Sequence, residues 1–361
     1  MTTASKRVAA GDASTGRDAT DPGPTGSRTG PRWSTRAAVL VGLAALLVAC
    51  VALSLAIGAR TIALADVWNA VVHHAPTRDG QIVRELRAPR TWLGIEVGVA
   101  LGVAGTLMQA MTRNPLADPG LLGVNAGAAT AVVTGIVVFG IGSFGGYVWL
   151  AFAGAAAALL LVHALGGRGG SASPVRLALA GTAISATLTA IVGGMVLLDP
   201  GAFETFRAWE VGSLTARGPS VAGPVAVFVI VGGFAALALA RPLNALALGD
   251  DTGRALGAHV GRTRAAAFAA IALLSGAATA AAGPIGFLGL TVPHMARALM
   301  GPDHRWVLPC AALLGPCLLL AADVLGRVVD RPGEIQVGVV AAILGAPVFI
   351  ALVRRRRIAA L

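Results

Sequence analysis

The sequence predicts an all-α polytopic membrane protein of about ten transmembrane helices, and three observations predict this fold class. Apolar residues make up 56% of the chain, charged residues make up 12%, and the mean hydropathy is +0.77. An ordinary soluble domain has about 25% charged residues. Runs of about 20 mainly apolar residues, enough to cross roughly 30 Å of hydrocarbon, recur along the sequence. Short breaks with Arg, Pro or Gly separate the runs, so lipid is the expected solvent.

Residues 1–36 come before the first apolar run and are rich in Gly, Ser, Thr, Asp and Pro. Such a composition cannot bury enough apolar surface to fold alone, so we expect a disordered tail. A ten-helix transmembrane domain is expected over 37–357, and 358–361 form the C-terminal end. The span over 285–300 is the shortest of the ten. The expected spans are 37–58, 92–111, 122–140, 147–165, 175–197, 221–240, 263–282, 285–300, 306–326 and 336–353.

Basic residues set the expected orientation of these spans. If the tail is cytoplasmic and ten spans alternate, most of the 28 basic residues fall on the inner side, among them Arg354 to Arg357. This distribution agrees with the positive-inside rule. We therefore expect a multi-pass protein of the plasma membrane with both termini in the cytoplasm. The net charge of +11 then reflects membrane topology, and no nucleic-acid partner is expected.

The stretch R-N-P-L-A-D-P-G-L-L-G, from Arg113 to Gly123, is the most informative feature for function. It separates two long apolar runs with prolines, which lack a backbone donor, and with Asn and Asp, which favour turns. Irregular backbone at membrane depth is tolerated only where protein buries it or water lines it. The stretch therefore predicts a translocation path or a hinge beside one.

Lys6 is the only lysine in the sequence, so the chain has no phosphate-binding loop of the G-x-x-x-x-G-K-[ST] type. If ATP drives transport, a separate subunit must bind the nucleotide and act on this chain. The longest inner loop, at 244–258, offers a surface for that contact. Asp250 and Asp251 stand at a candidate helix start and Gly257 at a candidate C-cap. A pair of short amphipathic helices and an ordinary solvated loop are both compatible with this spacing.

Several stretches, in their order and spacing, resemble the FecCD-type permeases of ATP-binding-cassette importers, which carry ferric siderophores, haem or cobalamin inward. Beside the loop at 244–258, they are R-A-P-R (87–90), L-M-Q-A-M-T-R-N-P-L-A-D-P-G-L-L-G-V-N-A-G-A (107–128), L-A-L-A-G-T-A (177–183), G-P-I-G-F-L-G-L-T-V-P-H-M-A-R (283–297), D-H-R (303–305) and G-V-V-A-A-I-L-G-A-P-V-F (338–349).

The resemblance implies two inverted repeats of five helices each. The break that begins at Gly283 lies five spans after the first break, and an odd offset reverses topology as inverted repeats require. The resemblance also implies a second permease subunit, identical or related, two ATP-binding-cassette ATPase subunits, an extracytoplasmic substrate-binding protein and surrounding membrane lipid. It implies no cofactor.

The resemblance implies that outward-facing arginines dock the substrate-binding protein, and the matching positions are Arg87, Arg90 and Arg327. Arginine suits this role because its planar fork binds a carboxylate through two hydrogen bonds. Two structural alternatives stay open. Arg87 and Arg90 could lie along the membrane interface with their charged ends in water, and Arg327 could pair with Asp323 four residues earlier.

By the same resemblance, the N-P-L turn and the loop before the fifth span form the cytoplasmic gate. Pro174 replaces a hydroxyl-bearing residue that the family pattern leads us to expect in that loop. The gate residues are Asn114, Pro115, Leu116, Ser173 and Pro174. The residues implied in ATPase coupling are Leu248, Gly249, Asp250, Asp251, Arg254, Ala255, Leu256 and Gly257.

Other polar residues within spans allow a structural or a functional interpretation. Glu96 and Gln109 could line the path or could be satisfied by neighbouring polar groups. His294 has no partner at metal-ligand spacing, so we expect no metal site. The three cysteines form no C-x-x-C pair and are expected to be small packing residues. They are Cys50, Cys310 and Cys317.

The expected function is that of an importer permease that works by alternating access, most similar to ferric-siderophore permeases, with haem or cobalamin as alternative substrates. An intramembrane enzyme that uses His294, Glu96 or Asp323 is the alternative from another class. That alternative needs a nucleophile and a base that converge, but the sequence has no G-x-S-x-G or H-E-x-x-H pattern. We therefore expect no catalytic residue and no enzymatic activity in this chain.

Overall fold

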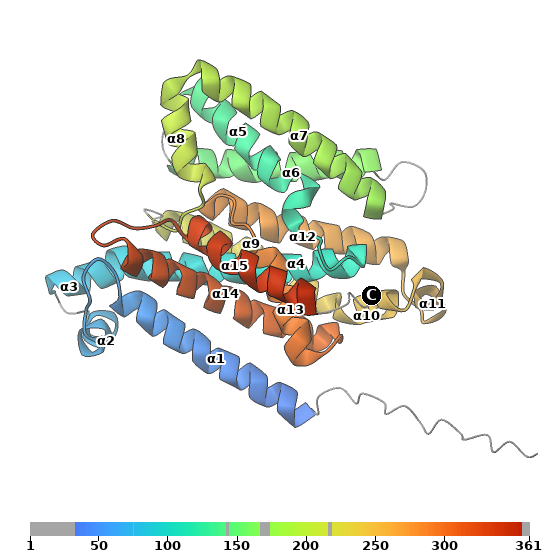
Figure 1. Cartoon of the computed structure of the whole chain (residues 1–361), viewed down its shortest axis with the longest axis horizontal. Coiled ribbons are helices and arrows are strands. Elements are labelled where there is room, and N and C mark those ends of the chain that lie inside the picture. The colour runs from blue at the N-terminus through green and yellow to red at the C-terminus, as the bar shows by residue number, and fades with distance from the viewer. Residues whose placement is uncertain (1–32, 75, 142–143, 167–173, 216–218, 356–361) are drawn as a thin grey trace, which may run out of the picture. The chain divides into compact units, whose positions relative to one another are not determined.

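A computed structural model describes residues 33–355, with gaps at 75, 142–143, 167–173 and 216–218. Every regular element of this described part is helical, which confirms the predicted fold class (Figure 1). The elements are α1 (Trp33–Ala56), α2 (Leu64–Val72), α3 (Arg78–Gln81), the π-helical turn η1 (Ile82–Arg87), α4 (Ala88–Thr112), the 3₁₀ turn η2 (Pro119–Leu122), α5 (Val124–Phe139), α6 (Phe144–Gly166), α7 (Pro174–Leu198), α8 (Pro200–Glu210), α9 (Pro219–Ala238), α10 (Ala240–Ala247), α11 (Asp250–Ala255), α12 (Val260–Ala282), α13 (Leu288–Met300), α14 (His304–Val329) and α15 (Val337–Arg355).

Each of the ten expected spans coincides with a helix. Within the described residues, seven helices are long and apolar enough to cross a membrane, and α5 and α15 supply shorter apolar stretches. The remaining span, α13, has 13 residues, in agreement with its prediction as the shortest. The chain is thus a multi-pass membrane protein.

The start of α1 corrects one predicted boundary. Residues 33–36 are helical and do not belong to the disordered tail expected over 1–36, of which 1–32 lie outside the described residues. The Trp33 ring packs edge-on against Trp306 at a centroid distance of 5.0 Å, and the Arg36 guanidinium lies 5.8 Å from the centre of the same indole. Aromatic and cation–π contacts of this kind favour an ordered first turn.

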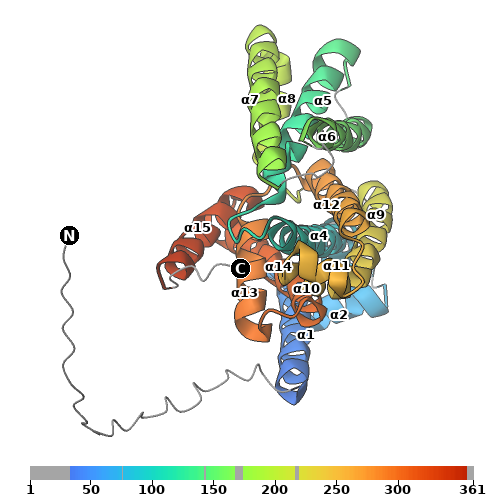
Figure 2. The same cartoon turned by 90° about the vertical axis from the view of Figure 1, so that its right-hand side faces the viewer.

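Helix α4 lies at the centre of the bundle and contacts α9, α12, α13 and α14 (Figure 2). Its glycines allow these neighbours to come close. A methyl group on Gly98 would lie 2.4 Å from the Cα atom of Pro316 in α14, and one on Gly105 would lie 1.9 Å from the carbonyl oxygen of Gly289 in α13. Small residues are common where membrane helices pack because they let backbones approach. The position of α4 therefore fixes the positions of its neighbours.

Helices α4 and α12 both end at a break. Arg113 after α4 and Phe287 after α12 have left-handed backbone conformations, with φ of 49° and 63°, which non-glycine residues adopt infrequently. The second break makes α13 short, because α13 can begin only after Phe287, which is the N-cap of this helix. The two irregular segments lie where the inverted-repeat pattern of the sequence places them.

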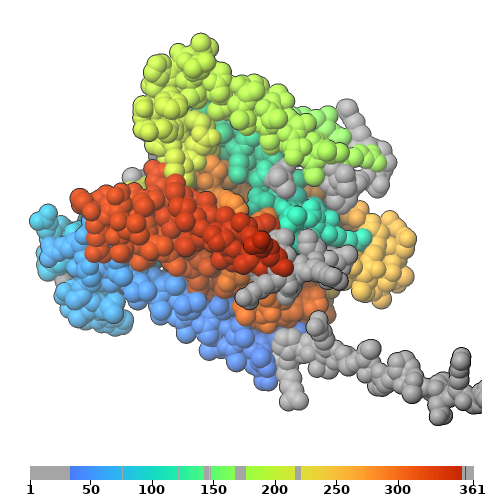
Figure 3. Space-filling view, in the orientation of Figure 1, coloured from blue at the N-terminus to red at the C-terminus, as the bar shows by residue number. Residues whose placement is uncertain are grey.

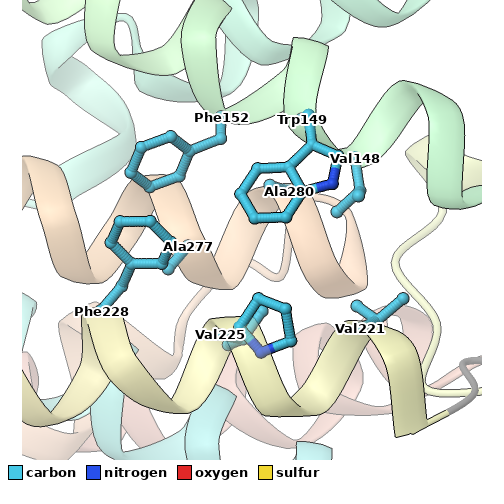
Figure 4. A pocket seen from close by; sticks show the side chains of 9 residues that line it. Val148, Trp149, Phe152, Val221, Val225, Phe228, Ala277 and Ala280 are labelled. Carbon is cyan, nitrogen blue, oxygen red and sulfur yellow. The ribbon is translucent and has the colours of Figure 1, made fainter.

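A small cavity of about 20 Å³ lies where α6, α9 and α12 meet (Figure 4). The Phe152 and Phe228 rings approach one another across it at a centroid distance of 4.5 Å. Its other lining residues are mainly aliphatic. A space this small holds about one water molecule and needs polar partners to do so. It is a packing gap with no chemistry suited to a ligand.

Candidate functional site

The segment between α4 and α5 is held by its own side chains. The Asn114 side-chain oxygen accepts a hydrogen bond from the Leu116 N–H at 2.9 Å, and the Asp118 carboxylate accepts one from the Gly120 N–H at 2.8 Å. Such local bonds satisfy backbone N–H groups that no longer have a helical partner, and they therefore stabilise an irregular backbone conformation. The break that the sequence predicts is thus a defined turn.

Of the expected gate residues, Asn114 and Leu116 are exposed and Pro115 is half-buried. The segment reaches the surface between α7 and α15, where its teal atoms are visible in Figure 3. Pro174 begins α7, and Ser173 lies outside the described residues. The structure therefore places the N-P-L side of the expected gate at the surface.

The loop between the sixth and seventh spans contains two short helices, α10 and α11, as one of the two sequence interpretations requires. Gly249 separates them with φ of 112°, and Gly257 follows them with φ of 84°, conformations that favour glycine. Leu248 and Leu256 are 66% and 63% exposed. The two leucines are the C-cap residues of α10 and α11, so each short helix is followed by an exposed large apolar side chain. We call 244–258 the coupling segment from here on, after the role that the resemblance noted in the sequence leads us to expect.

Polar contacts attach the coupling segment to the rest of the bundle at two places. At α11, the Asp250 carboxylate pairs with Arg113 at 2.7 Å and with Arg264 of α12 at 2.9 Å. At α10, the Asn244 amide donates to Asp303 at 2.6 Å, and its oxygen accepts from the His304 N–H at 2.9 Å. Arg113 belongs to the break, so the coupling segment and the break share an ion pair.

Asp303 lies in the short connection between α13 and α14. Burial by itself would raise the pKa of its carboxyl, but hydrogen bonds from the Arg305 N–H and the Asn244 amide, with the charges of Arg305 and Arg36, hold this pKa below its ordinary value. Asp303 is therefore ionised at neutral pH and keeps its bond to Asn244.

The three arginines expected to dock a binding protein are buried. Arg90 donates to Asp323 at 2.7 Å and to Glu334 at 2.6 Å. Arg327 donates to the other oxygen of Asp323 at 2.5 Å and to the Ser54 carbonyl at 2.8 Å. The alternative in which Arg327 pairs with Asp323 is thus observed. Sequence inspection missed Glu334 and Ser54, which carry no local signal.

Arg87 has no carboxylate partner among the described contacts and donates instead to the carbonyl oxygens of Leu55 and Ala56, at 2.7 and 2.8 Å. All three buried arginines line a surface hollow of about 500 Å³ together with Arg60, two acids, Glu85 and Glu334, and other residues. The alternative in which Arg87 and Arg90 extend their charged ends into water does not describe them, because both residues are largely buried and their guanidinium groups donate to protein oxygens.

The two polar residues expected to line the path lie inside the bundle. Gln109 is fully buried, donates to the Leu290 carbonyl at 3.2 Å and accepts from Arg297. It thereby joins α4 to α13. Glu96 faces an apolar hollow of about 590 Å³ among α1, α4, α9 and α14. Within the described residues, its oxygens have no hydrogen-bond partner of normal geometry.

His294 and the cysteines have local structural contacts. The His294 Nδ1 atom lies 2.9 Å from the Leu290 carbonyl oxygen one turn earlier. The described residues contain no group of three or more His, Cys, Asp or Glu side chains arranged to hold a metal ion. The three cysteines are buried and unpaired, as packing residues are expected to be; they are Cys50, Cys310 and Cys317.

The central helix α4 ends at a break, and this break is bonded to the helix pair α10 and α11. Comparison with known proteins places this arrangement in a family. The model of the FecCD transport family matches residues 46–355. This chain belongs to the FecCD transport family. The match includes both breaks, the coupling segment and the buried arginines, so the resemblance noted in the sequence is confirmed.

This FecCD-family chain is 50% identical over 323 residues to the ferric enterobactin transport system permease protein FepD of Escherichia coli (strain K12), a match that covers 89% of this chain and 96% of the relative. It is 38% identical over 326 residues to the hemin transport system permease protein HmuU of Yersinia pestis, covering 88% and 96% of the two chains. A solved inward-facing metal-chelate type ABC transporter matches it with a TM-score of 0.79 and 27% identity, over 89% of this chain and 100% of that chain.

Proposed function

We propose that this chain is the permease subunit of an ATP-binding-cassette importer of ferric siderophores. The observation that carries the proposal is the 50% identity, over nearly the whole length, to a ferric enterobactin permease. The geometry supports it, because a broken central helix joined to a surface helix pair lets motion of that pair open or close a translocation path. The same arrangement is unsuited to chemistry on a substrate. Haem and cobalamin are the competing substrates, since a hemin permease and a cobalamin permease are also among the relatives.

The proposed mechanism is alternating access. ATP binding brings two partner ATPase subunits together, the coupling segment moves with them, and the two inverted halves rock around the path. This chain binds no nucleotide and needs no cofactor. A second permease subunit, identical or related, completes the path. The coupling segment and both termini then face the cytoplasm, and the arginine-lined hollow faces the extracytoplasmic binding protein.

We propose that the hollow lined by Arg87, Arg90 and Arg327 receives an acidic side chain of the binding protein. Arg87 supports this proposal, because its guanidinium donates to the carbonyl oxygens of Leu55, Ala56 and Arg60 and takes part in none of the described ion pairs. A partner carboxylate at the rim would supply the missing opposite charge. Electrostatic complementarity of this kind mainly speeds encounter and sets orientation.

Reconstitution into vesicles tests the proposed function. With ATPase subunits, binding protein and ATP, the chain is expected to accumulate ⁵⁵Fe-labelled ferric enterobactin, because only the partners supply energy and cargo. The same vesicles without the ATPase subunits are expected to show background uptake. Parallel assays with haemin and cobalamin decide between substrate classes. ATP hydrolysis by the purified chain alone, or full uptake without partners, would refute the proposal.

We propose that Asn114 and Leu116, with Pro115, Ser173 and Pro174, narrow the inner end of the path. A cysteine at Leu116 is therefore expected to react with a polar maleimide several-fold faster when the inner end is open than when it is closed by trapped nucleotide. Leu64→Cys, at a 60% exposed position of α2, serves as the control and is expected to react equally in both states. The native cysteines are buried, so unmodified protein gives the background. Equal rates at Leu116 would remove it from the gate.

A further inference from the structure

The break after α4 and the coupling segment are joined at one carboxylate. Asp250, the first residue of α11, lies 2.7 Å from the Arg113 guanidinium and 2.9 Å from that of Arg264 in α12. The same Arg113 nitrogen also donates to the Leu246 carbonyl at the end of α10. Three elements thus meet at Asp250: the start of α11, the start of the following helix α12, and the end of α4, whose Arg113 is 137 residues away in the sequence.

Arg113 is held in an unfavourable conformation at this point. Its φ is 49°, a left-handed conformation in which a side chain with a Cβ atom is strained. Strained residues persist where surrounding contacts hold them, and they are common in switch segments. Arg113 is held by Asp250 and Leu246, both in the coupling segment. The next residue in the chain is Asn114, where the exposed turn begins.

We propose that Asp250 is the positioning residue through which the coupling segment moves the α4 break. When α11 shifts, the carboxylate draws Arg113 with it, and the adjacent Asn114–Leu116 turn follows. The inference rests on the proposed function, because it assigns the contact by which a partner ATPase would act on the path. The proposed link joins the coupling segment to the Asn114–Leu116 turn.

The second attachment of the coupling segment makes the proposal separable from loss of structure. Asn244 binds Asp303 and His304 at the α13–α14 connection, at 2.6 and 2.9 Å. This contact involves neither Asp250 nor Arg113. Removing the Asp250 charge weakens the ion pairs of α11 with Arg113 and Arg264, while the Asn244 contacts and the Arg113–Leu246 bond still hold α10, so the ATPase subunits still find a folded surface.

The experiment measures siderophore uptake and ATP hydrolysis together in the complete reconstituted transporter. Asp250→Asn is expected to lower the uptake per ATP hydrolysed about tenfold relative to the unmodified transporter, a typical size for coupling between sites. Arg113→Gln is expected to do the same. Both changes break the Asp250–Arg113 ion pair, so the double variant is expected to lose less than the sum of the two single losses.

Glu204→Gln is the matched control, because Glu204 is an exposed acid that pairs with Arg207 at 2.8 Å in α8, away from the coupling segment. It is expected to keep the unmodified ratio of uptake to ATP. An unchanged ratio in Asp250→Asn would overturn the proposal, and so would a parallel loss of uptake and hydrolysis, which would make Asp250 an ATPase contact. If Asp250→Asn fails to assemble, Arg113→Gln carries the test. Failure of the unmodified transporter to import would instead refute the proposed function.

Discussion

Gly98→Ala is expected to cause a large loss of folded protein, although it adds a single methyl group. The new Cβ would lie 2.4 Å from the Cα and 2.5 Å from the N of Pro316. Both are backbone atoms of α14, so no side-chain rotation can relieve the clash, and α4 and α14 must separate. Overpacking of a well-packed interior typically costs about 1–3 kcal/mol. We expect a cost at or above the upper end, measured as a fall in unfolding temperature and in yield of monodisperse protein.

Gly42→Ala in α1 provides the control for this change. A methyl group at Gly42 would meet no atom within 4 Å, and alanine is at least as good a helix former as glycine. The control is expected to keep the unfolding temperature and yield of the unmodified protein. If Gly98→Ala matched Gly42→Ala in both measurements, close approach of α4 and α14 would not be needed for the fold.

The spans could be predicted because lipid imposes a simple rule on sequence. A helix that crosses the membrane must be about 20 residues long and apolar, and hydropathy records this directly. The connecting helices follow no such rule. Among them, α8 starts at an Asp199–Pro200 N-cap, with Asp199 accepting from the Ala202 N–H at 3.0 Å. This signal was present in the sequence, but a search for spans does not use it.

The environment of the arginines could not be predicted for a different reason. Arg90 and Asp323 are 233 residues apart, and their contact depends on the packing of α4 against α14. Sequence spacing revealed only the pair within one helix, Asp323 and Arg327. Likewise, the spacing of Asp250 indicated the start of a helix but carried no sign of Arg113, which reaches it from another helix. Long-range ion pairs need the fold before they can be found.

Asp323→Ala is expected to be among the most destabilising single changes in this chain, apart from changes such as Gly98→Ala at glycines where helices touch. Asp323 is 1% exposed and receives both Arg90 and Arg327. Its removal leaves two buried cations close together, with Glu334 as the nearest acid bonded to Arg90. Breaking a buried ion pair by removing one partner costs about 3–5 kcal/mol. The measurement is the unfolding temperature of purified protein in detergent, together with its yield.

Glu334→Gln separates the effect of burial from the effect of lost charge. Glu334 is also bonded to Arg90, at 2.6 Å, but its side chain is 31% exposed, whereas that of Asp323 is 1% exposed. Water can therefore replace part of the lost interaction. The expected loss in the free energy of unfolding is closer to the value for surface ion pairs, which is about 0–1 kcal/mol. Equal losses in the two variants would show that burial does not set the strength of this network. Normal stability in Asp323→Ala would show that Asp323 is not needed to hold the two buried arginines, and that Glu334 is enough to offset their charge.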